Sequence, residues 1–185
     1  FYIVVKLTSF TMTLSSIVTI AGAKGGVGKT TTSLNVASAL AESGRSVGVV
    51  EMDLAMANFL DFLSIPCEDS DPTLHDVLAG DADPAEAMYE FGENVTAIPS
   101  GTSLDGYAAA ELDRLPDVLS AYADELDILI LDTGAGLNRA VVDPMRLADG
   151  AVVVSTPRIA SVRDAEKTIQ LADRVDTDTY GLVLT

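Results

Sequence analysis

The stretch "AGAKGGVGKTTT", residues 21–32, decides the fold class of this 185-residue chain. Its glycine-rich turn ends in Gly28-Lys29-Thr30, which is the GK[S/T] end of the phosphate-loop pattern GxxxxGK[S/T]. The β-type run "SSIVTIAG" leads into it, and the helix-periodic run "KTTTSLNVASALAESG" continues from it. In a strand–loop–helix unit of this kind, backbone N–H groups and a helix N-terminus converge on phosphate oxygens. The stretch therefore predicts a phosphate-binding loop.

The loop contains two lysines, although an ordinary phosphate loop needs one. Lys29 is expected to reach the β and γ phosphates of a nucleotide, and the hydroxyl of Thr30 is expected to bind Mg²⁺. Lys24 stands at the entrance of the loop, where ordinary phosphate-loop chemistry gives it no role. The predicted nucleotide-binding residues are Lys24, Gly25, Gly26, Val27, Gly28, Lys29, Thr30 and Thr31.

Strand-like and helix-like runs alternate along the rest of the chain. This order predicts an α/β fold, with a doubly wound, mostly parallel sheet and helices on both faces. The uninterrupted apolar run "LDILILD", residues 126–132, predicts a central strand that is buried on both faces. Other strands are expected in "SVGVVEMD", "NVTAIPSG", "GAVVVST" and "YGLVLT", and helices in "DPTLHDVLAG", "DADPAEAMYE", "LPDVLSAYADE", 138–148 and 160–174.

The chain organisation is expected to be simple. Residues 13–185 predict a single domain that is truncated at its C-terminus, and residues 1–12 predict a disordered leader ahead of a start at Met12. No apolar run reaches the roughly 18 to 20 residues that a membrane span needs. The one cysteine, Cys67, has no disulfide partner in the chain and fits a reducing cytoplasm. We expect a cytoplasmic protein that reaches a membrane surface only through a segment beyond Thr185.

The formal net charge of −17 is the strongest compositional signal. It disfavours binding to DNA and to anionic lipid, since both need Lys and Arg to neutralise phosphates. An Asp-rich and Lys-poor composition is typical of proteins from high-salt-adapted organisms, and we expect such an origin. The chain has four lysines, and two of them, Lys24 and Lys29, lie in the phosphate loop.

Three acidic residues stand at strand ends that should face the loop. Glu51 and Asp53 end the run "SVGVVEMD", and Asp132 ends "LDILILD". Ligands of open parallel sheets lie beyond the carboxyl ends of the strands. Asp132 is the expected second magnesium-side carboxylate, beside Thr30. Asp53 is predicted to orient the attacking water, and Glu51 to support the metal shell.

Four segments together resemble the ParA/MinD superfamily of P-loop ATPases with a deviant phosphate loop. "KGGVGKTT" resembles its loop with the additional lysine, and "VVEMDLAMAN" resembles its switch I stretch, with Glu51, Asp53 and Asn58 at the signature positions. "ILILDTGAG" resembles its Walker B and switch II stretch, and "STPRIASVRDAEKT" is similar to a segment of the cell-division MinD branch.

The resemblance implies an ATPase that binds Mg–ATP, dimerises on ATP and acts as a switch that positions a regulatory or cargo protein. It implies that Lys24 reaches across the dimer interface to the ATP of the partner copy, a role comparable to that of an arginine finger. The catalytic residues would then be Asp53, Lys24 and Glu51. The alternatives are a DNA partition ATPase, a carrier of metal clusters and a scaffold without turnover. An amphipathic helix, a basic patch or a CxxC pair beyond Thr185 would separate the positioning switch, the DNA partition ATPase and the cluster carrier.

Two residues depart from the family pattern, and one histidine stands apart. Glu51 replaces the usual Asp, which is expected to alter the metal-side geometry slightly, and Gly134 replaces a common Pro, which is expected to loosen switch II. His75, the one histidine of the chain, lies on an acidic predicted helix and is expected at the surface.

Overall fold

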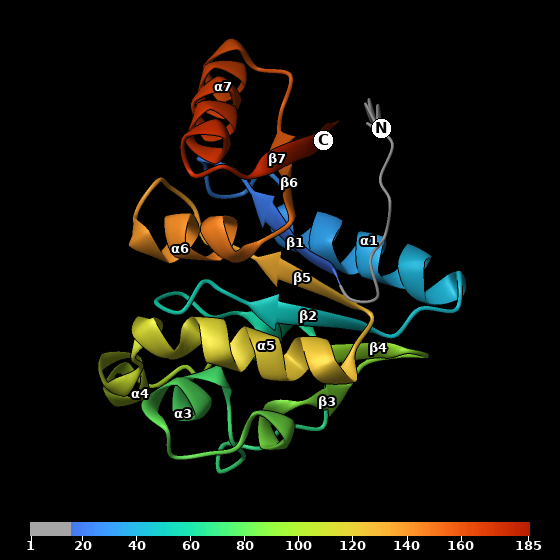
Figure 1. Cartoon of the computed structure of the whole chain (residues 1–185), viewed down its shortest axis with the longest axis vertical. Coiled ribbons are helices and arrows are strands. Elements are labelled where there is room, and N and C mark those ends of the chain that lie inside the picture. The colour runs from blue at the N-terminus through green and yellow to red at the C-terminus, as the bar shows by residue number, and fades with distance from the viewer. Residues whose placement is uncertain (1–15) are drawn as a thin grey trace.

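The computed structural model describes residues 16–185, which form a seven-stranded sheet with the order β3-β4-β2-β5-β1-β6-β7 (Figure 1). All neighbouring strands are parallel except β3, which pairs antiparallel with β4. The predicted leader over residues 1–12 and the start at Met12 lie outside the described residues. The strands are β1 Ser16–Ala21, β2 Val47–Glu51, β3 Tyr89–Glu90, β4 Val95–Ile98, β5 Ile128–Asp132, β6 Gly150–Ser155 and β7 Asp178–Leu184.

Helices cover both faces of the sheet (Figure 1). α1 and α2 pack on one face, and α3, α5 and α6 pack on the other. α7 packs against β6 and β7. No helix of the described chain has the length and apolar character needed to cross a membrane. The helices are α1 Lys29–Glu42, α2 Phe59–Phe62, α3 Leu74–Ala79, α4 Leu104–Ala109, α5 Leu115–Glu125, α6 Arg139–Leu147 and α7 Ile159–Arg174, with 3₁₀ turns at Pro84–Ala87 and Leu112–Arg114.

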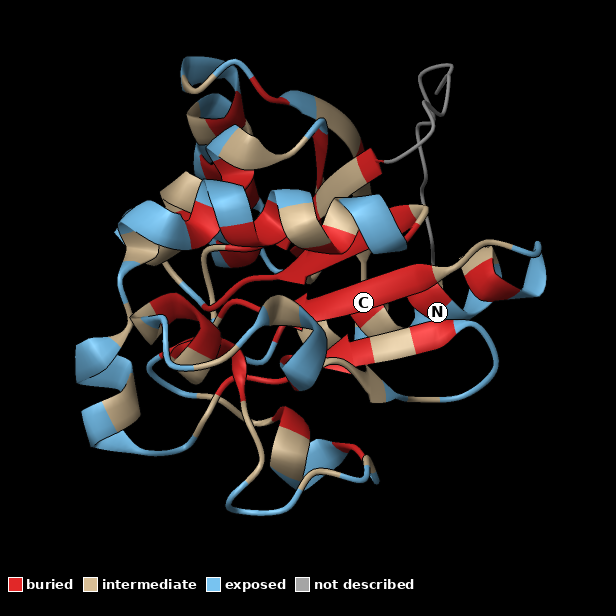
Figure 2. Cartoon of the chain, turned by 60° about the horizontal axis from the view of Figure 1, so that its bottom comes forward, coloured by how far each residue is buried: buried red, intermediate tan, exposed pale blue. Residues whose placement is uncertain are grey.

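The central strands are buried on both sides, as the colours of Figure 2 show. Successive residues of β5 alternate between the two cores: Leu129 and Leu131 pack with α3 and α5, whereas Ile130 packs with α1. This alternation explains why residues 128–131 are all apolar, because each of their side chains meets a helix layer. The predicted doubly wound, mostly parallel fold and the central place of this strand are confirmed.

The segment "DADPAEAMYE" differs from the predicted helix. Asp83 forms a capping box with Glu86, and Pro84 opens a 3₁₀ turn, but the turn ends at Ala87. Tyr89 then pairs with β4 as part of the antiparallel strand β3, and its hydroxyl donates to the carbonyl of Pro72 at 2.7 Å. Because β4 offers a free edge beside these residues, Tyr89 and Glu90 pair with it as a strand, although their sequence pattern favours a helix. The helix predicted in "DPTLHDVLAG" is present as α3, and Thr73 caps it through a capping box with Asp76.

Strand register brings three strand ends together. Asp132 is level with Ile20 of β1 on one side and with Glu51 of β2 on the other. The loops that leave these strands therefore start side by side at the carboxyl edge of the sheet. This edge is where ligands bind in open α/β sheets.

The core contains one polar group whose removal should not weaken the fold. Tyr122 on α5 is 0% exposed, burial raises the pKa of its phenol, and its hydroxyl has no hydrogen-bond partner among the described residues. We expect Tyr122→Phe to leave the free energy of unfolding unchanged or to raise it by about 1 kcal/mol, since an unpaired buried hydroxyl is removed. Chemical denaturation measures this. Leu119→Ala on the same helix is the control and should lose about 2–5 kcal/mol. A loss of stability in Tyr122→Phe would show that the hydroxyl is paired.

Candidate nucleotide-binding site

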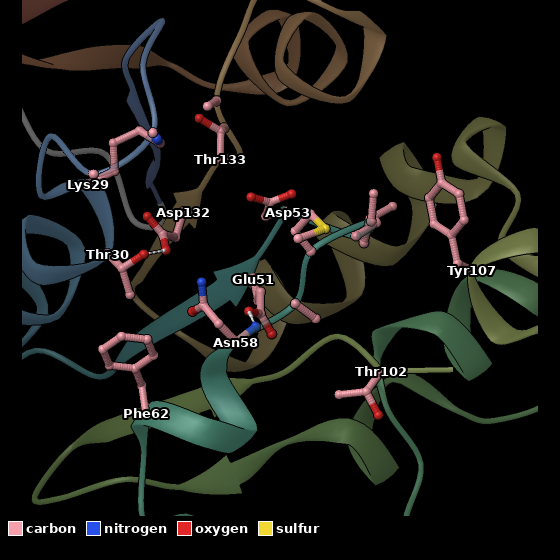
Figure 3. A pocket seen from close by; sticks show the side chains of 18 of the residues that line it. Lys29, Thr30, Glu51, Asp53, Asn58, Phe62, Thr102, Tyr107, Asp132 and Thr133 are labelled. Atoms are coloured by element: carbon pink, nitrogen blue, oxygen red, sulfur yellow. Dashed lines mark hydrogen bonds between the residues drawn. The ribbon is translucent and has the colours of Figure 1, made fainter. Parts of the chain in front are cut away.

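A cavity of about 730 Å³ opens at the carboxyl edge of the sheet (Figure 3). Its volume lies within the range of small-molecule sites. Every residue predicted for the site lines it except Lys24 and Val27. The predicted residues that line it are Gly25, Gly26, Gly28, Lys29, Thr30, Thr31, Glu51, Asp53 and Asp132.

The loop between β1 and α1 forms one wall of the cavity. Gly26 and Gly28 have φ values of 72° and 90°, a left-handed conformation that favours glycine. A Cβ atom on Gly25 or Gly26 would have open space around it, so the inside of the turn leaves room for a ligand. The first glycine position of the GxxxxGK[S/T] pattern is occupied by Ala23, and Gly22 serves packing instead, since its Cβ would lie 2.7 Å from the carbonyl oxygen of Val154.

Lys29, the first residue of α1, is only 8% exposed. Its ammonium donates a hydrogen bond to the carbonyl oxygen of Lys24 at 3.3 Å, which lays the side chain back over the loop. Burial lowers the pKa of Lys29, while the charges of Asp132 and Asp53 act in the opposite direction. The arrangement supplies one buried cation beside the glycine turn.

Thr30 and Asp132 meet directly, as expected for two residues on the metal side of a phosphate site. The Thr30 hydroxyl donates to Oδ2 of Asp132 at 2.7 Å, and the hydroxyl of Ser33, one helical turn later, donates to Oδ1 at 2.8 Å. Asp132 is 4% exposed, and burial raises its pKa, against the effect of the two hydroxyls and of Lys29. Both hydroxyls that donate to this carboxylate therefore come from α1.

This pair has the chemistry of a Mg²⁺ site. Mg²⁺ takes oxygen ligands and is commonly held by one or two carboxylates together with substrate phosphates and waters. A hydroxyl and a carboxylate lie within hydrogen-bond distance of each other beside the phosphate loop. Residues 16–185 contain no group of three or more His, Cys, Asp or Glu side chains arranged to hold a metal ion. The hydroxyl of Thr30 and the carboxylate of Asp132 have the chemistry that fits Mg²⁺ bound through phosphates.

Asp53 follows β2 and points into the same cavity (Figure 3). Burial raises its pKa, and the charge of Lys29 lowers it, so the two side chains share one electrostatic environment. Within residues 16–185, no hydrogen bond or ion pair joins its carboxylate to another side chain. Asp53 is the acid of this site that remains available to act on a substrate.

Glu51 has a different environment from the one expected for a metal-side residue. Its side chain is 1% exposed; one carboxylate oxygen accepts the backbone N–H groups of Asn58 and Phe59, and the other accepts that of Ser100 at 2.9 Å. Burial raises the pKa of Glu51 to about 7, and these hydrogen bonds oppose the rise. The geometry favours a role in fixing the end of switch I over direct support of a metal shell.

Lys24 does not line the cavity. Its ammonium forms an ion pair with Asp164 on α7 at 3.0 Å, and 42% of its side chain is exposed. Lys167 contacts the other oxygen of Asp164 at 3.2 Å. Val27 is buried, and its carbonyl accepts the hydroxyl of Thr185 at 2.9 Å.

The sequence did not identify the wall that faces switch I. The start of α4 and the turn before it line the cavity, with the ring of Tyr107 on this side (Figure 3). The signal that could have found this wall was the position of "PSG", which directly follows strand β4 at the same edge of the sheet. The residues of this wall are Gly101, Thr102, Ser103, Leu104 and Tyr107.

The expected surface position of His75 was wrong. His75 is 2% exposed, and its Nε2 lies 3.1 Å from the carbonyl oxygen of Leu54 in switch I. Burial lowers its pKa. α3 is covered by α4 as well as by the core, and the ring of Tyr107 lies 6.2 Å from that of His75. The histidine thus holds the switch I backbone at Leu54.

The fold and this constellation define a P-loop nucleotide-binding protein. The family described as AAA domain matches residues 15–180. An uncharacterised ATP-binding protein of Methanocaldococcus jannaschii is 43% identical over 167 residues, which cover 90% of this chain and 62% of the relative. The septum site-determining protein MinD of Bacillus subtilis is 32% identical over 160 residues, which cover 85% of this chain and 59% of the relative.

Solved structures agree with these relatives. The cell division ATPase MinD of Pyrococcus furiosus superimposes with a TM-score of 0.83 at 33% identity, over 91% of this chain and 70% of that one. MinD of Pyrococcus horikoshii, in complex with Mg-ADP, also gives 0.83, at 34% identity, over 91% and 69%. The chain belongs to the ParA/MinD superfamily of P-loop ATPases. It spans 62% and 63% of the length of two curated relatives from M. jannaschii.

The environment of Glu51 predicts a pH-dependent contribution to stability. Because its pKa rises from 4.5 to about 7, the folded chain binds more protons here than the unfolded chain between these pH values. The free energy of unfolding should therefore fall as pH rises through this window. In Glu51→Gln the side-chain amide turns an N–H group toward a backbone N–H, so we expect a loss of about 1–3 kcal/mol.

Chemical denaturation at pH 5 and pH 8 measures both effects. The deficit of Glu51→Gln relative to wild type should be larger at pH 5, where the neutral carboxyl group stabilises the wild-type fold. Glu166→Gln, on the exposed face of α7, is the matched control and should show neither effect. A deficit that grows from pH 5 to pH 8 would contradict the raised pKa.

Proposed function

We propose that this protein is a Mg²⁺-dependent ATPase that dimerises in its ATP-bound state and uses hydrolysis as a switch for positioning partner proteins. One observation carries the proposal: the glycine turn, Lys29, the Thr30–Asp132 pair and Asp53 all meet in one cavity. The membership of the chain in the ParA/MinD superfamily supports ATP as the nucleotide. The relatives named as septum site-determining proteins support a role in spatial positioning.

In the proposed reaction, the backbone N–H groups of the glycine turn and the N-terminus of α1 bind the phosphates of ATP. Lys29 places its charge on the β and γ phosphates. When bound, Mg²⁺ neutralises charge that develops on the phosphate oxygens, and Thr30 and Asp132 hold it in place. Asp53 orients the attacking water and accepts its proton, while Glu51 and His75 hold the switch I backbone that carries Asp53.

The surface around the cavity supports the proposed dimer. Several large apolar side chains line the mouth of the cavity and are still exposed, notably Met56 at 73% and Phe62 at 74%. Leu104 and Tyr107 extend this apolar mouth on the side of α4. Exposed apolar side chains gathered around a polar site are typical of surfaces that another protein covers. A second copy that closes over the nucleotide would bury them.

The position of Lys24 supports a role toward the partner copy. Lys29 already occupies the cavity, whereas Lys24 lies outside its lining and is held by Asp164 on α7. Half-exposed ion pairs of this kind are weak, so Lys24 can leave Asp164 at little cost. We propose that it then reaches the phosphates bound by the second copy.

Substitution of Asp53 tests the hydrolytic assignment. We expect Asp53→Ala to bind ATP with nearly wild-type affinity and to lose turnover by about 10²–10⁴-fold, because this carboxylate acts on the attacking water and not on the bound phosphates. Phosphate release measures turnover, and a fluorescent ATP analogue measures affinity. Asp61→Ala, on the exposed side of α2 outside the cavity, is the matched control. Unchanged turnover in Asp53→Ala would refute the role, and the absence of Mg²⁺-dependent turnover in the wild type would refute the proposed activity.

Substitution of Lys24 tests the dimer. Lys24→Ala should bind ATP nearly normally as a monomer but fail to dimerise, and its turnover should lose the steeper-than-linear dependence on protein concentration expected for the wild type. Light scattering with a non-hydrolysed ATP analogue, on the full-length protein, measures the dimer. Lys167→Ala removes the other lysine on Asp164 and should dimerise normally. If Lys24→Ala dimerises as well as wild type, the proposed contact across the interface fails.

A further inference from the structure

Gly134 has no side chain, and the Asp53 carboxylate occupies the space that a Cβ atom at this position would take. A Cβ atom at position 134 would lie 2.8 Å from Cγ and Oδ1 of Asp53 and 3.0 Å from Oδ2. Non-bonded carbon atoms approach favourably only to about 3.5–4.0 Å, so a Cβ atom at position 134 requires the Asp53 carboxylate to move from its present position. Gly134 lies in the loop of residues 133–138, between β5 and α6.

The glycine is needed here for space and not for its backbone conformation. Gly134 does not have a positive φ, whereas Gly136, two residues later, has a φ of 107°. An alanine at position 134 would therefore suit the backbone, and the contact with Asp53 is what opposes it. The expectation that glycine at this position merely loosens switch II does not account for this contact.

Neighbouring strands hold the two residues against each other. The backbone N–H of Met52 donates to the carbonyl of Asp132 at 2.9 Å, which continues the pairing of β2 with β5 up to the residues in question. Asp53 lines the nucleotide cavity and also a second cavity of about 320 Å³, which Gly134 lines as well. A carboxylate that is displaced from its present position therefore has free volume beside it in the second cavity.

We propose that Gly134 is a positioning residue. Because it has no side chain, the Asp53 carboxylate can lie against its α-carbon and stay in the nucleotide cavity. Any displacement of the loop 133–138 is then passed by contact to the acid that orients the attacking water. The inference rests on the proposed ATPase function and assigns its control to one contact between switch I and switch II. Misplacement of a reacting group by about 1 Å can cost about 10²-fold in rate, so a contact of this size is sufficient.

A double-mutant cycle on stability tests the contact without reference to catalysis. Gly134→Ala is measured in three backgrounds: wild type, Asp53→Asn, which keeps the volume, and Asp53→Ala, which removes it. We expect Gly134→Ala to lower the midpoint of thermal unfolding in the first two backgrounds. In the third it should be neutral or raise the midpoint, as Gly→Ala does where the backbone allows it. An equal change in all three backgrounds would overturn the contact.

Kinetics then tests the consequence. Gly134→Ala should lower kcat by about 10²-fold, with little change in the affinity for a fluorescent ATP analogue. Ala39→Ser, on the exposed face of α1 and outside the lining of the cavity, is the control and should keep kcat. An unchanged kcat in a Gly134→Ala variant that shows the stability coupling would overturn the positioning role. Absence of turnover in the wild type would instead refute the proposed function and leave the contact standing.

Discussion

The carboxylate of Asp132 joins the phosphate loop to the sheet. It accepts hydrogen bonds from Thr30 and Ser33, two residues of the helix that starts at the loop, and it ends the central strand β5. Successive strand residues point to opposite faces, so a shift of β5 by one residue would turn this side chain away from α1. The position of the loop therefore depends on the pairing of β5 with β1 and β2.

The balance of charge in the cavity gives a physical reason for a second cation. Among the described residues that line it, Lys29 is the one Lys or Arg, and it faces the carboxylates of Asp53 and Asp132. Backbone N–H groups and a helix dipole favour an anion there, but they carry only partial charges. A nucleoside triphosphate in this cavity would need positive charge from groups that do not line it. Mg²⁺ and the Lys24 of a second copy are the sources that the proposed function supplies.

Much of the fold followed from local patterns in the sequence. The apolar run of β5, the glycine turn and the acids at strand ends each depend on neighbours in the chain or on the common edge of a parallel sheet. The meeting of Thr30 with Asp132 was therefore expected before the structure. The contact of Gly134 with Asp53 was not expected, because β2 and β5 are far apart in the sequence.

The features that were missed all arise from contacts between distant segments. His75 follows Leu74 and precedes Val77 and Leu78, which face the core, but its own burial comes from α4, some thirty residues further along the chain. The strand at Tyr89 forms because β4 offers a free edge. The periodicity of a local sequence does not show which element packs over another. The burial of His75 and the strand at Tyr89 could therefore not be predicted from the pattern alone.

Switch I combines fixed ends with an exposed tip. Glu51 binds the backbone of Asn58 and Phe59, and His75 binds the carbonyl of Leu54, whereas Met56 between them is 73% exposed. A partner that covers the tip therefore meets a segment whose ends are anchored by buried polar groups. The loop at Gly134 touches the same segment from the other side, at Asp53. The acid proposed for hydrolysis thus lies between the exposed tip of switch I and the loop that leaves the central strand.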